Sequence, residues 1–166
     1  MWIVKVALNR PYTFIVVALL ILLASPVRPL FFKNRYEIWK QMTADDSQII
    51  FVAECPENGV VGFVNGSSAR DQGYEDFAEV WAIYLLQHYH GKKVGLRLLK
   101  AYCDVCAEKG FSKGYLWVLK NNPTIRFYEK SGGRRGDGVK KDVICGRNIE
   151  EHRYVEDNIR LTVGET

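Results

Sequence analysis

Residues 78–99 read AEVWAIYLLQHYHGKKVGLRLL, and this stretch decides the predicted fold. Its apolar run VWAIYLL (80–86) indicates a strand, and residues 96–110 have the apolar spacing of a helix. Between the two lies the short loop HGKKVG (90–95). A strand, a glycine-bearing loop and a helix start form the usual cradle for a phosphate, because backbone N–H groups and the helix dipole attract an anion.

A second stretch lies about 30 residues further on and reads LWVLKNNPTIRFYEKSGGR (116–134). Its first part continues a strand predicted over 114–120. Residues 122–133 then predict a short helix, with Pro123 at its start and Gly132 just past its end, where these two residue types are favoured. The chain therefore repeats the order of a strand followed by a helix.

The remaining pattern completes a mixed α+β domain. An amphipathic helix is predicted over 31–42, and a polar loop over 69–77. Strands are predicted over 48–55 and 60–68, joined by the turn 56–59, over 79–86, and over 141–145 and 151–156 at the end.

This order and its two motifs resemble the GNAT N-acetyltransferase superfamily over roughly residues 31–157. The family's acetyl-CoA loop reads Gln/Arg-x-x-Gly-x-Gly/Ala, and His90, Lys93 and Gly95 stand in its first, fourth and sixth places. Residues 122–133 resemble the family's Asn-Pro-x-x-x-Phe-Tyr-x-x-x-Gly-Gly ending. The resemblance implies a central, mostly antiparallel mixed sheet of six or seven strands, with splayed central strands and helices on both faces.

The resemblance also implies acetyl-CoA as cosubstrate, with no metal. The main chain of two strand-end residues and the loop would hold it, together with Asn122 and Arg126 on the second motif. The residues implied in the strand end and loop are Leu85, Leu86, His90, Gly91, Lys92, Lys93, Val94, Gly95 and Leu96. Lys93 stands where the family has glycine, and a positive φ there would cost on the order of 1 kcal/mol.

Two residues are the candidates for the chemistry. Tyr128 is the expected general acid, because a phenol can protonate a departing thiolate; the alternative is an aromatic packed against the sheet, a role expected more of Phe127. Glu79, on the acceptor side by resemblance, is the expected base; its alternative is an ordinary strand-edge carboxylate. Asp71, Glu75 and Asp76 make the preceding loop acidic, which suits a cationic amine.

The expected function is an acyltransferase that moves acetyl from acetyl-CoA to a primary amine of a small molecule or peptide, by direct attack in a ternary complex. The alternatives are an impaired CoA-binding module tethered to a membrane, and a fusion product whose acceptor site is incomplete. The partners expected are acetyl-CoA and the amine, with the chain a monomer or homodimer in the cytoplasm or on the cytosolic face of a membrane.

Composition narrows the partners further. The 166 residues carry 23 Lys+Arg and 19 Asp+Glu, a net charge of +4. Three of the basic residues lie in the first 30 positions, which hold no acid, so the remainder is close to neutral and a poor nucleic-acid binder. Cys103 and Cys106 form a CxxC inside the predicted helix; core thiols are favoured over a metal or redox site, because no second ligand pair accompanies them.

Residues 1–30 form a segment distinct from the domain at 31–166. The apolar run FIVVALLILLA (14–24) would span ~17 Å as a helix, against a hydrocarbon core of ~30 Å. Residues 1–24 resemble the N-terminus of resistance-nodulation-division efflux transporters. Three interpretations stay open: a membrane anchor through residues 12–27, a strand at MWIVKVAL (1–8) with a helix over 12–25 folded into the domain, and an appended sequence.

Overall fold

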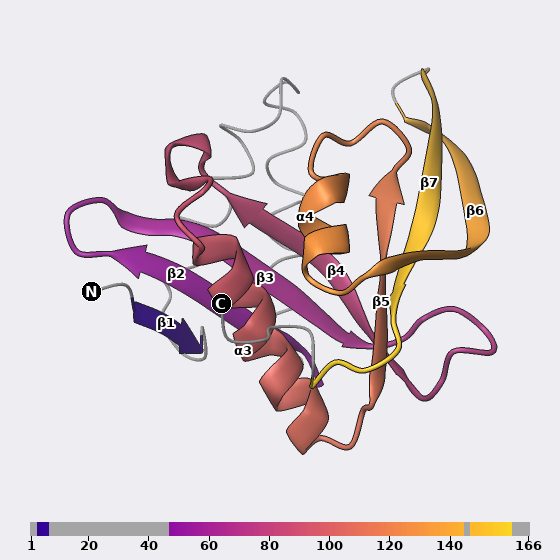
Figure 1. Cartoon of the computed structure of the whole chain (residues 1–166), viewed down its shortest axis with the longest axis horizontal. Helices are drawn as coiled ribbons and strands as arrows, with labels where there is room; N and C mark the ends of the chain where they lie inside the picture. The colour runs from indigo at the N-terminus through magenta and orange to yellow at the C-terminus, as the bar shows by residue number, and fades with distance from the viewer. Residues whose placement is uncertain (1–2, 7–46, 145–146, 161–166) are drawn as a thin grey trace. The chain divides into compact units, whose positions relative to one another are not determined.

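A computed structural model of the chain describes residues 3–6, 47–144 and 147–160 (Figure 1). The helices predicted over 12–25 and 31–42 lie outside these ranges, as does the proposed membrane segment 12–27. Across the described ranges, no helix has the length and apolar character needed to cross a membrane. The chain divides into two compact units, which we describe one at a time: the first unit is Met1–Gly66 with Ala82–Tyr102, and the second is Ser67–Trp81 with Cys103–Thr166.

The described strands belong to a seven-stranded sheet with the order β1-β2-β3-β4-β5-β7-β6. The pair β4 and β5 is parallel, whereas β1 with β2, β2 with β3, β5 with β7 and β6 with β7 are antiparallel. This confirms the predicted α+β class and its mixed, mostly antiparallel sheet.

In the first unit, β1 (Ile3–Val6), β2 (Ile49–Cys55) and β3 (Gly59–Ser68) follow one another as antiparallel neighbours (Figure 1). Strands β2 and β3 are buried along nearly their whole length, which explains their continuous apolar sequence. Val52 and Phe63 face each other in the ladder and form a core with Val60 and Ala82. The strand at Ile3–Val6 agrees with the interpretation that residues 1–8 begin the domain's sheet.

Helix α3 (Val94–Glu108) follows the loop and begins two residues before the helical run expected over 96–110. Its buried residues recur three, four or five positions apart on one face, whereas Arg97, Lys100, Asp104 and Glu108 lie exposed. The buried residues are Val94, Leu98, Leu99, Tyr102, Cys103 and Cys106. Both thiols of the CxxC pair are thus buried in the core, as predicted.

In the second unit, β5 (Lys113–Leu119) lies between the start of β4 (Phe77–Leu85) and β7 (Arg147–Glu156). The ladder between β4 and β5 joins Phe77–Val80 to Lys113–Leu116, the first four residues of each strand. It ends before Trp81 and Trp117, so the pairing is confined to one end of the two strands.

Strand β6 (Arg134–Ile144) is longer than the strand predicted over 141–145. It begins in the sequence RRGDG, which has neither alternating polarity nor β-branched residues. The ladder to β7 shifts register between Arg135 and Val139, and this bulge absorbs the two glycines. Strand β7 likewise begins before the expected residue 151, because pairing with β6 extends it back to Arg147.

Candidate active site

The predicted cofactor loop lies in the first unit, between β4 and α3. A short 3₁₀ turn, Gln87–Tyr89, comes first, and Gly91, Lys92 and Lys93 complete the loop before the helix begins. Gly91 has φ of +73° and Lys93 has φ of +59°, whereas an L side chain rarely adopts a positive φ. The sequence anticipated this conformation for Lys93, and it costs on the order of 1 kcal/mol relative to glycine.

The loop has the features of an anion receptor. Lys93 O accepts the N–H of Arg97 at 3.1 Å, so Lys93 begins the α-helical hydrogen-bond pattern. The first N–H groups of an α-helix have no partner within the helix itself. The first turn of α3 holds no acidic residue. Lys92 and Lys93 are exposed beside this end. These groups fit a diphosphate, because the backbone donors, the helix dipole and the ammonium groups all attract a negative charge.

His90 fastens the loop to the end of β4. Its Nε2 lies 3.1 Å from the carbonyl oxygen of Leu85, and since a carbonyl only accepts, the tautomer in this contact carries hydrogen on Nε2. Leu86 is also engaged within the first unit: its N–H donates to Val61 O, and its carbonyl accepts from Tyr89. The expected cofactor contacts of His90, Leu85 and Leu86 stay predictions, and they would add to these existing bonds.

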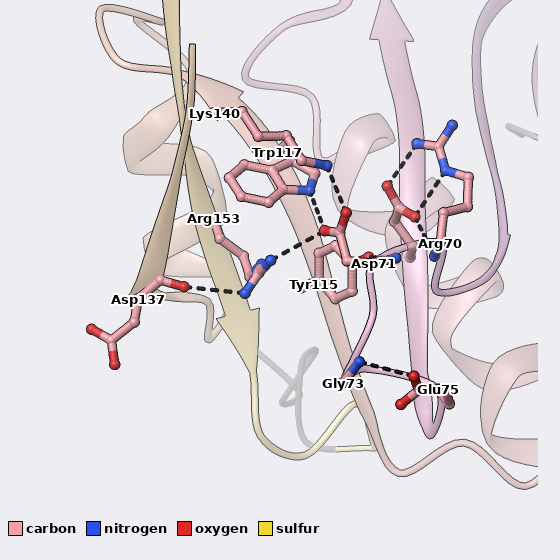
Figure 2. A network of polar contacts seen from close by, with 10 residues as sticks. Arg70, Asp71, Gly73, Glu75, Tyr115, Trp117, Asp137, Lys140 and Arg153 are labelled. Atoms are coloured by element: carbon pink, nitrogen blue, oxygen red, sulfur yellow. Dashed lines mark hydrogen bonds and ion pairs between the residues drawn. The ribbon is translucent and has the colours of Figure 1, made fainter.

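Glu79, in the second unit, is held by Arg70 (Figure 2). Arg70 Nη2 donates to Glu79 Oε1 at 2.7 Å, while Arg70 Nε and backbone N–H both donate to Oε2 at 3.0 Å. The Glu79 side chain is 1% exposed, and that of Arg70 is 60% exposed and stacked over the Trp81 ring at 4.6 Å. The hydrogen bond to Glu79 raises the pKa of Arg70, so this guanidinium stays charged. Glu79 is therefore a buried, paired carboxylate and not a strand-edge one.

Asp71, which follows Arg70 in the sequence, anchors the loop 69–76 to the strands (Figure 2). Its carboxylate accepts from Trp117 Nε1 at 2.8 Å, Lys140 Nζ at 2.8 Å and Arg153 Nη2 at 3.2 Å. Burial alone would raise the pKa of Asp71, but the hydrogen bonds from Lys140, Trp117 and Tyr115 lower it to about 2. Asp71 thus does not offer a free charge to an amine, unlike the acidic-rim interpretation of the loop.

Arg153 completes this network from β7. Its guanidinium lies 3.9 Å from the Tyr74 ring centroid and 4.6 Å from that of Trp117, and Nη1 donates to Asp137 O at 3.1 Å. Such stacking stabilises a guanidinium through the negative face of the rings. Arg70 and Arg153 were not among the residues expected from the sequence. The available signal for Arg153 was the alternation of the aromatic residues Tyr115 and Trp117 on one face of β5, because Trp117 is opposite Arg153 in the ladder.

The second motif forms helix α4 (Ile125–Lys130) in the second unit. Asn122 Oδ1 accepts from the backbone N–H of Thr124 at 2.9 Å and from its hydroxyl at 2.6 Å, which shapes the turn before the helix. After the helix, Gly133 N–H bonds to Tyr128 O at 3.0 Å, and Gly132 has φ of +99°. Gly132 therefore lies just past the end of the helix, as predicted, whereas Pro123 lies in the turn two residues before the first helical residue, and the helix is shorter than 122–133.

Tyr128 is the buried residue of α4, at 9% exposure. Its ring contacts that of Phe127 edge-on, with 5.3 Å between the ring centroids. Phe127 is only half-buried, so Tyr128 is the better packed of the two, whereas the packing role was expected of Phe127. Arg126, expected at the cofactor, is exposed. Tyr128 and Asn122 belong to the second unit and the loop to the first, so the roles of all these residues stay predictions.

The model of the acetyltransferase (GNAT) family matches residues 17–133, more than half of the chain. This chain belongs to the GNAT acetyltransferase family. The match begins inside the apolar N-terminal run, and a transporter-like N-terminus finds no support in the comparisons. The likeness of residues 1–24 to an efflux transporter was thus a misleading resemblance, since a short run of Leu, Ile and Val carries little family information.

One curated relative is an uncharacterized N-acetyltransferase, YuaI, of Bacillus subtilis (strain 168), 31% identical over 100 residues. Those residues are 59% of this chain and 55% of that protein, so the chain spans about half the length of the curated relative it matches.

Two solved structures show the same fold. A GNAT-family acetyltransferase structure from Desulfovibrio desulfuricans has a TM-score of 0.75 at 14% identity, covering 96% of this chain and 99% of that one. A chimera of the spermidine N-acetyltransferase SpeG of Vibrio cholerae has a TM-score of 0.74 at 19% identity, covering 99% of each chain.

Within the described ranges, no three His, Cys, Asp or Glu side chains gather in a way that could hold a metal ion.

Proposed function

We propose that this protein is an N-acetyltransferase that transfers the acetyl group of acetyl-CoA to a primary amine of a small molecule or peptide. The observation that carries the proposal is the loop 90–95, whose positive φ values, helix start and two exposed lysines suit a diphosphate. Family membership supports acetyl transfer in general. Lys92, Lys93 and the backbone from His90 to Leu96 would hold the diphosphate, with Asn122 and Arg126 near the rest of the cofactor.

In the proposed reaction the amine nitrogen attacks the thioester carbon directly. A C–N bond forms, the C–S bond breaks, and the amide and the free thiol of CoA leave. Tyr128 would give its phenolic proton to the departing sulfur and recover a proton from the amine through water.

Glu79 is the candidate base on the acceptor side. To take the amine's proton it must free an oxygen from Arg70, and the exposed guanidinium of Arg70 can turn into solvent without crossing the core. If the pair stays closed, Glu79 is a positioning residue and water removes the proton. The acceptor would be a cationic amine in solution that reacts as the neutral form.

One observation favours a second candidate, a CoA-binding module without catalysis: the carboxylate expected to act is already neutralised by Arg70. A thiol-release assay with acetyl-CoA and a panel of amines separates the two. Thiol release that depends on both substrates supports the enzyme. CoA binding without amine-dependent release would support the binding module.

A further inference from the structure

Asn58, far from the predicted loop 90–95 in the sequence, contacts the residue directly before that loop. Asn58 lies in the turn between β2 and β3, and its Nδ2 donates to the hydroxyl of Tyr89 at 2.7 Å, across 31 residues of sequence. Tyr89 is the last residue of the 3₁₀ turn that leads into the loop, and it is buried at 8% exposure. All of these residues lie in the first unit.

The turn that carries Asn58 is itself well fixed. Asn58 N–H bonds to Cys55 O at 3.3 Å, and Gly59 supplies the positive φ that closes the hairpin. The Asn58 amide also lies 3.7 Å from Cys55 Sγ, and that sulfur donates to Glu57 Oε2 at 2.8 Å. The contacts of Asn58 with Cys55 therefore orient its amide toward Tyr89.

Tyr89 passes this constraint to the loop. The ammonium of Lys92 lies 5.1 Å from the centroid of the Tyr89 ring, within range of a cation–π contact. Backbone bonds from Tyr89 N–H to Leu86 O at 2.9 Å and from His90 N–H to Gln87 O at 3.0 Å fix the residues on either side. The Tyr89 ring therefore favours one position of the Lys92 ammonium, but only weakly, because Lys92 is exposed.

A loop with Lys93 in the left-handed region needs such support. A non-glycine residue with positive φ persists where its surroundings over-determine the backbone. In this chain the Asn58–Tyr89 bond and the His90–Leu85 bond fasten the loop before Lys93, and α3 begins directly after it. Where the family has a flexible glycine, this chain has a lysine held from both sides.

We infer that Asn58 is a positioning residue for the cofactor: through Tyr89 it holds Lys92 and the loop 90–95 in the shape that receives a diphosphate. Asn58 sets the affinity for CoA without touching it. This inference rests on the proposed function, because it takes CoA as the ligand of the loop.

The test measures CoA binding by titration calorimetry for the full chain and for Asn58→Ala, Tyr89→Phe and the double variant. Each single variant should bind CoA about 3- to 10-fold more weakly, as expected for one lost hydrogen bond. The double variant should bind no more weakly than Tyr89→Phe alone, because loss of the hydroxyl already breaks the bond to Asn58, together with a hydrogen bond to Cys55. In turnover, the KM for acetyl-CoA should rise while the KM for the acceptor stays unchanged.

The control for lost stability is Cys106→Ala. Cys106 is fully buried and belongs to the second unit, whereas the loop belongs to the first, so its truncation should weaken the packing of the second unit. This variant should unfold more easily yet bind CoA as the wild type does. Tyr89→Phe removes a single oxygen and keeps the ring, so it tests the bond even if Asn58→Ala disturbs the hairpin.

The outcomes are distinct. Wild-type protein that binds no CoA overturns the proposed function and this inference with it. Wild-type binding with unchanged affinity in Tyr89→Phe overturns the inference alone. If the double variant loses as much CoA-binding free energy as the two single variants together, the inference is also overturned, because the two substitutions would then act independently and not through one shared bond.

Discussion

Both carboxylate oxygens of Glu79 are bonded by the guanidinium of Arg70, nine residues earlier, with Arg70 Nη2 at 2.7 Å and Nε at 3.0 Å. The carboxylate is almost wholly buried, whereas the guanidinium is largely exposed over Trp81. The pair joins the loop 69–76 to β4 and keeps the candidate base paired and enclosed.

Removing either partner of this pair should have different effects. Arg70→Met should lower the free energy of unfolding by about 2 kcal/mol, because it removes both guanidinium hydrogen bonds from a buried carboxylate and leaves only the bond from the backbone N–H of residue 70. Glu79→Gln should be milder, since the amide keeps the shape and removes the charge. If Glu79 is the base, Glu79→Gln should also lower kcat by about 10²-fold or more. Urea unfolding measures the stability of each variant, and turnover assays measure its kcat. An unaltered kcat of Glu79→Gln would show that the pair has only a structural role.

Acetyl-CoA should raise the melting temperature of the protein. A ligand that binds the native state stabilises it by mass action, by about 2.7 kcal/mol at a concentration 100 times Kd. Differential scanning fluorimetry with acetyl-CoA, with free CoA and with adenosine as a control measures the shift. If saturating acetyl-CoA leaves the melting temperature of a well-folded sample unchanged, the proposed function loses its main support.

Lys93→Gly should change CoA affinity by less than about tenfold, or 1.4 kcal/mol. Glycine adopts the observed φ of +59° without strain, and the backbone N–H that faces an anion is retained. Lys92→Gly is the matched variant, because Lys92 has no positive φ to relieve. A complete loss of binding in Lys93→Gly would show that the ammonium, and not the loop backbone, carries the interaction.

Tyr128→Phe should lower kcat by ~10²–10⁴-fold with little change in CoA affinity. The ring still packs against Phe127, and only the proton donor is lost. Phe127→Leu is the control, since it disturbs the same helix without removing a proton donor. Measurements of kcat from pH 6 to 9 test whether Tyr128 is the general acid. An unchanged kcat of Tyr128→Phe over this range would make water the proton source.

Asp71 should make stability depend on pH at the acid end. Its pKa in the folded protein is about 2, below the ordinary value of 3.8. A depressed pKa contributes stability that is complete above pH ~4 and is lost as the pH falls through about 2. Asp71→Asn should therefore destabilise the protein at pH 7, by about 2 kcal/mol for charge-assisted hydrogen bonds, and flatten the profile between pH 4 and 2.

The control for Asp71 lies in the same loop. Glu75 is exposed and accepts from the N–H of Gly73 at 2.9 Å, so Glu75→Gln should leave the unfolding transition at pH 7 almost unchanged. Equal losses in Glu75→Gln and Asp71→Asn would mean that the loop's total charge matters and the network does not. Unfolding by urea at pH 7, 4 and 2 measures both variants.

The sequence predicted the elements whose signals are local. The strand–loop–helix at 78–110 has its polarity pattern, glycine and helix start within a few residues, so its positions agree with the structure. The start of β6 at Arg134 was missed, because a bulged strand of Gly, Arg and Asp has no period and is defined by its partner β7.

The same distinction holds for the candidate site. The positive φ of Lys93 could be anticipated, since a family glycine marks that position. The Arg70–Glu79 pair could not, because it depends on how the loop 69–76 turns back on β4. Asn122 has a visible local role in the turn before α4, and in the sequence an asparagine that shapes a turn cannot be told from one that binds a cofactor.

The indole of Trp117 has a consequence for spectroscopy. Its N–H bonds to the Asp71 carboxylate, and the ammonium of Lys140 lies 4.1 Å from its ring centroid, with Arg153 also against the ring. An excited indole responds strongly to charges this close, so its emission wavelength depends on whether Asp71 stays in place. The intrinsic fluorescence of Trp117 thus offers a label-free optical readout of the loop 69–76, with Trp117→Phe identifying its share of the signal.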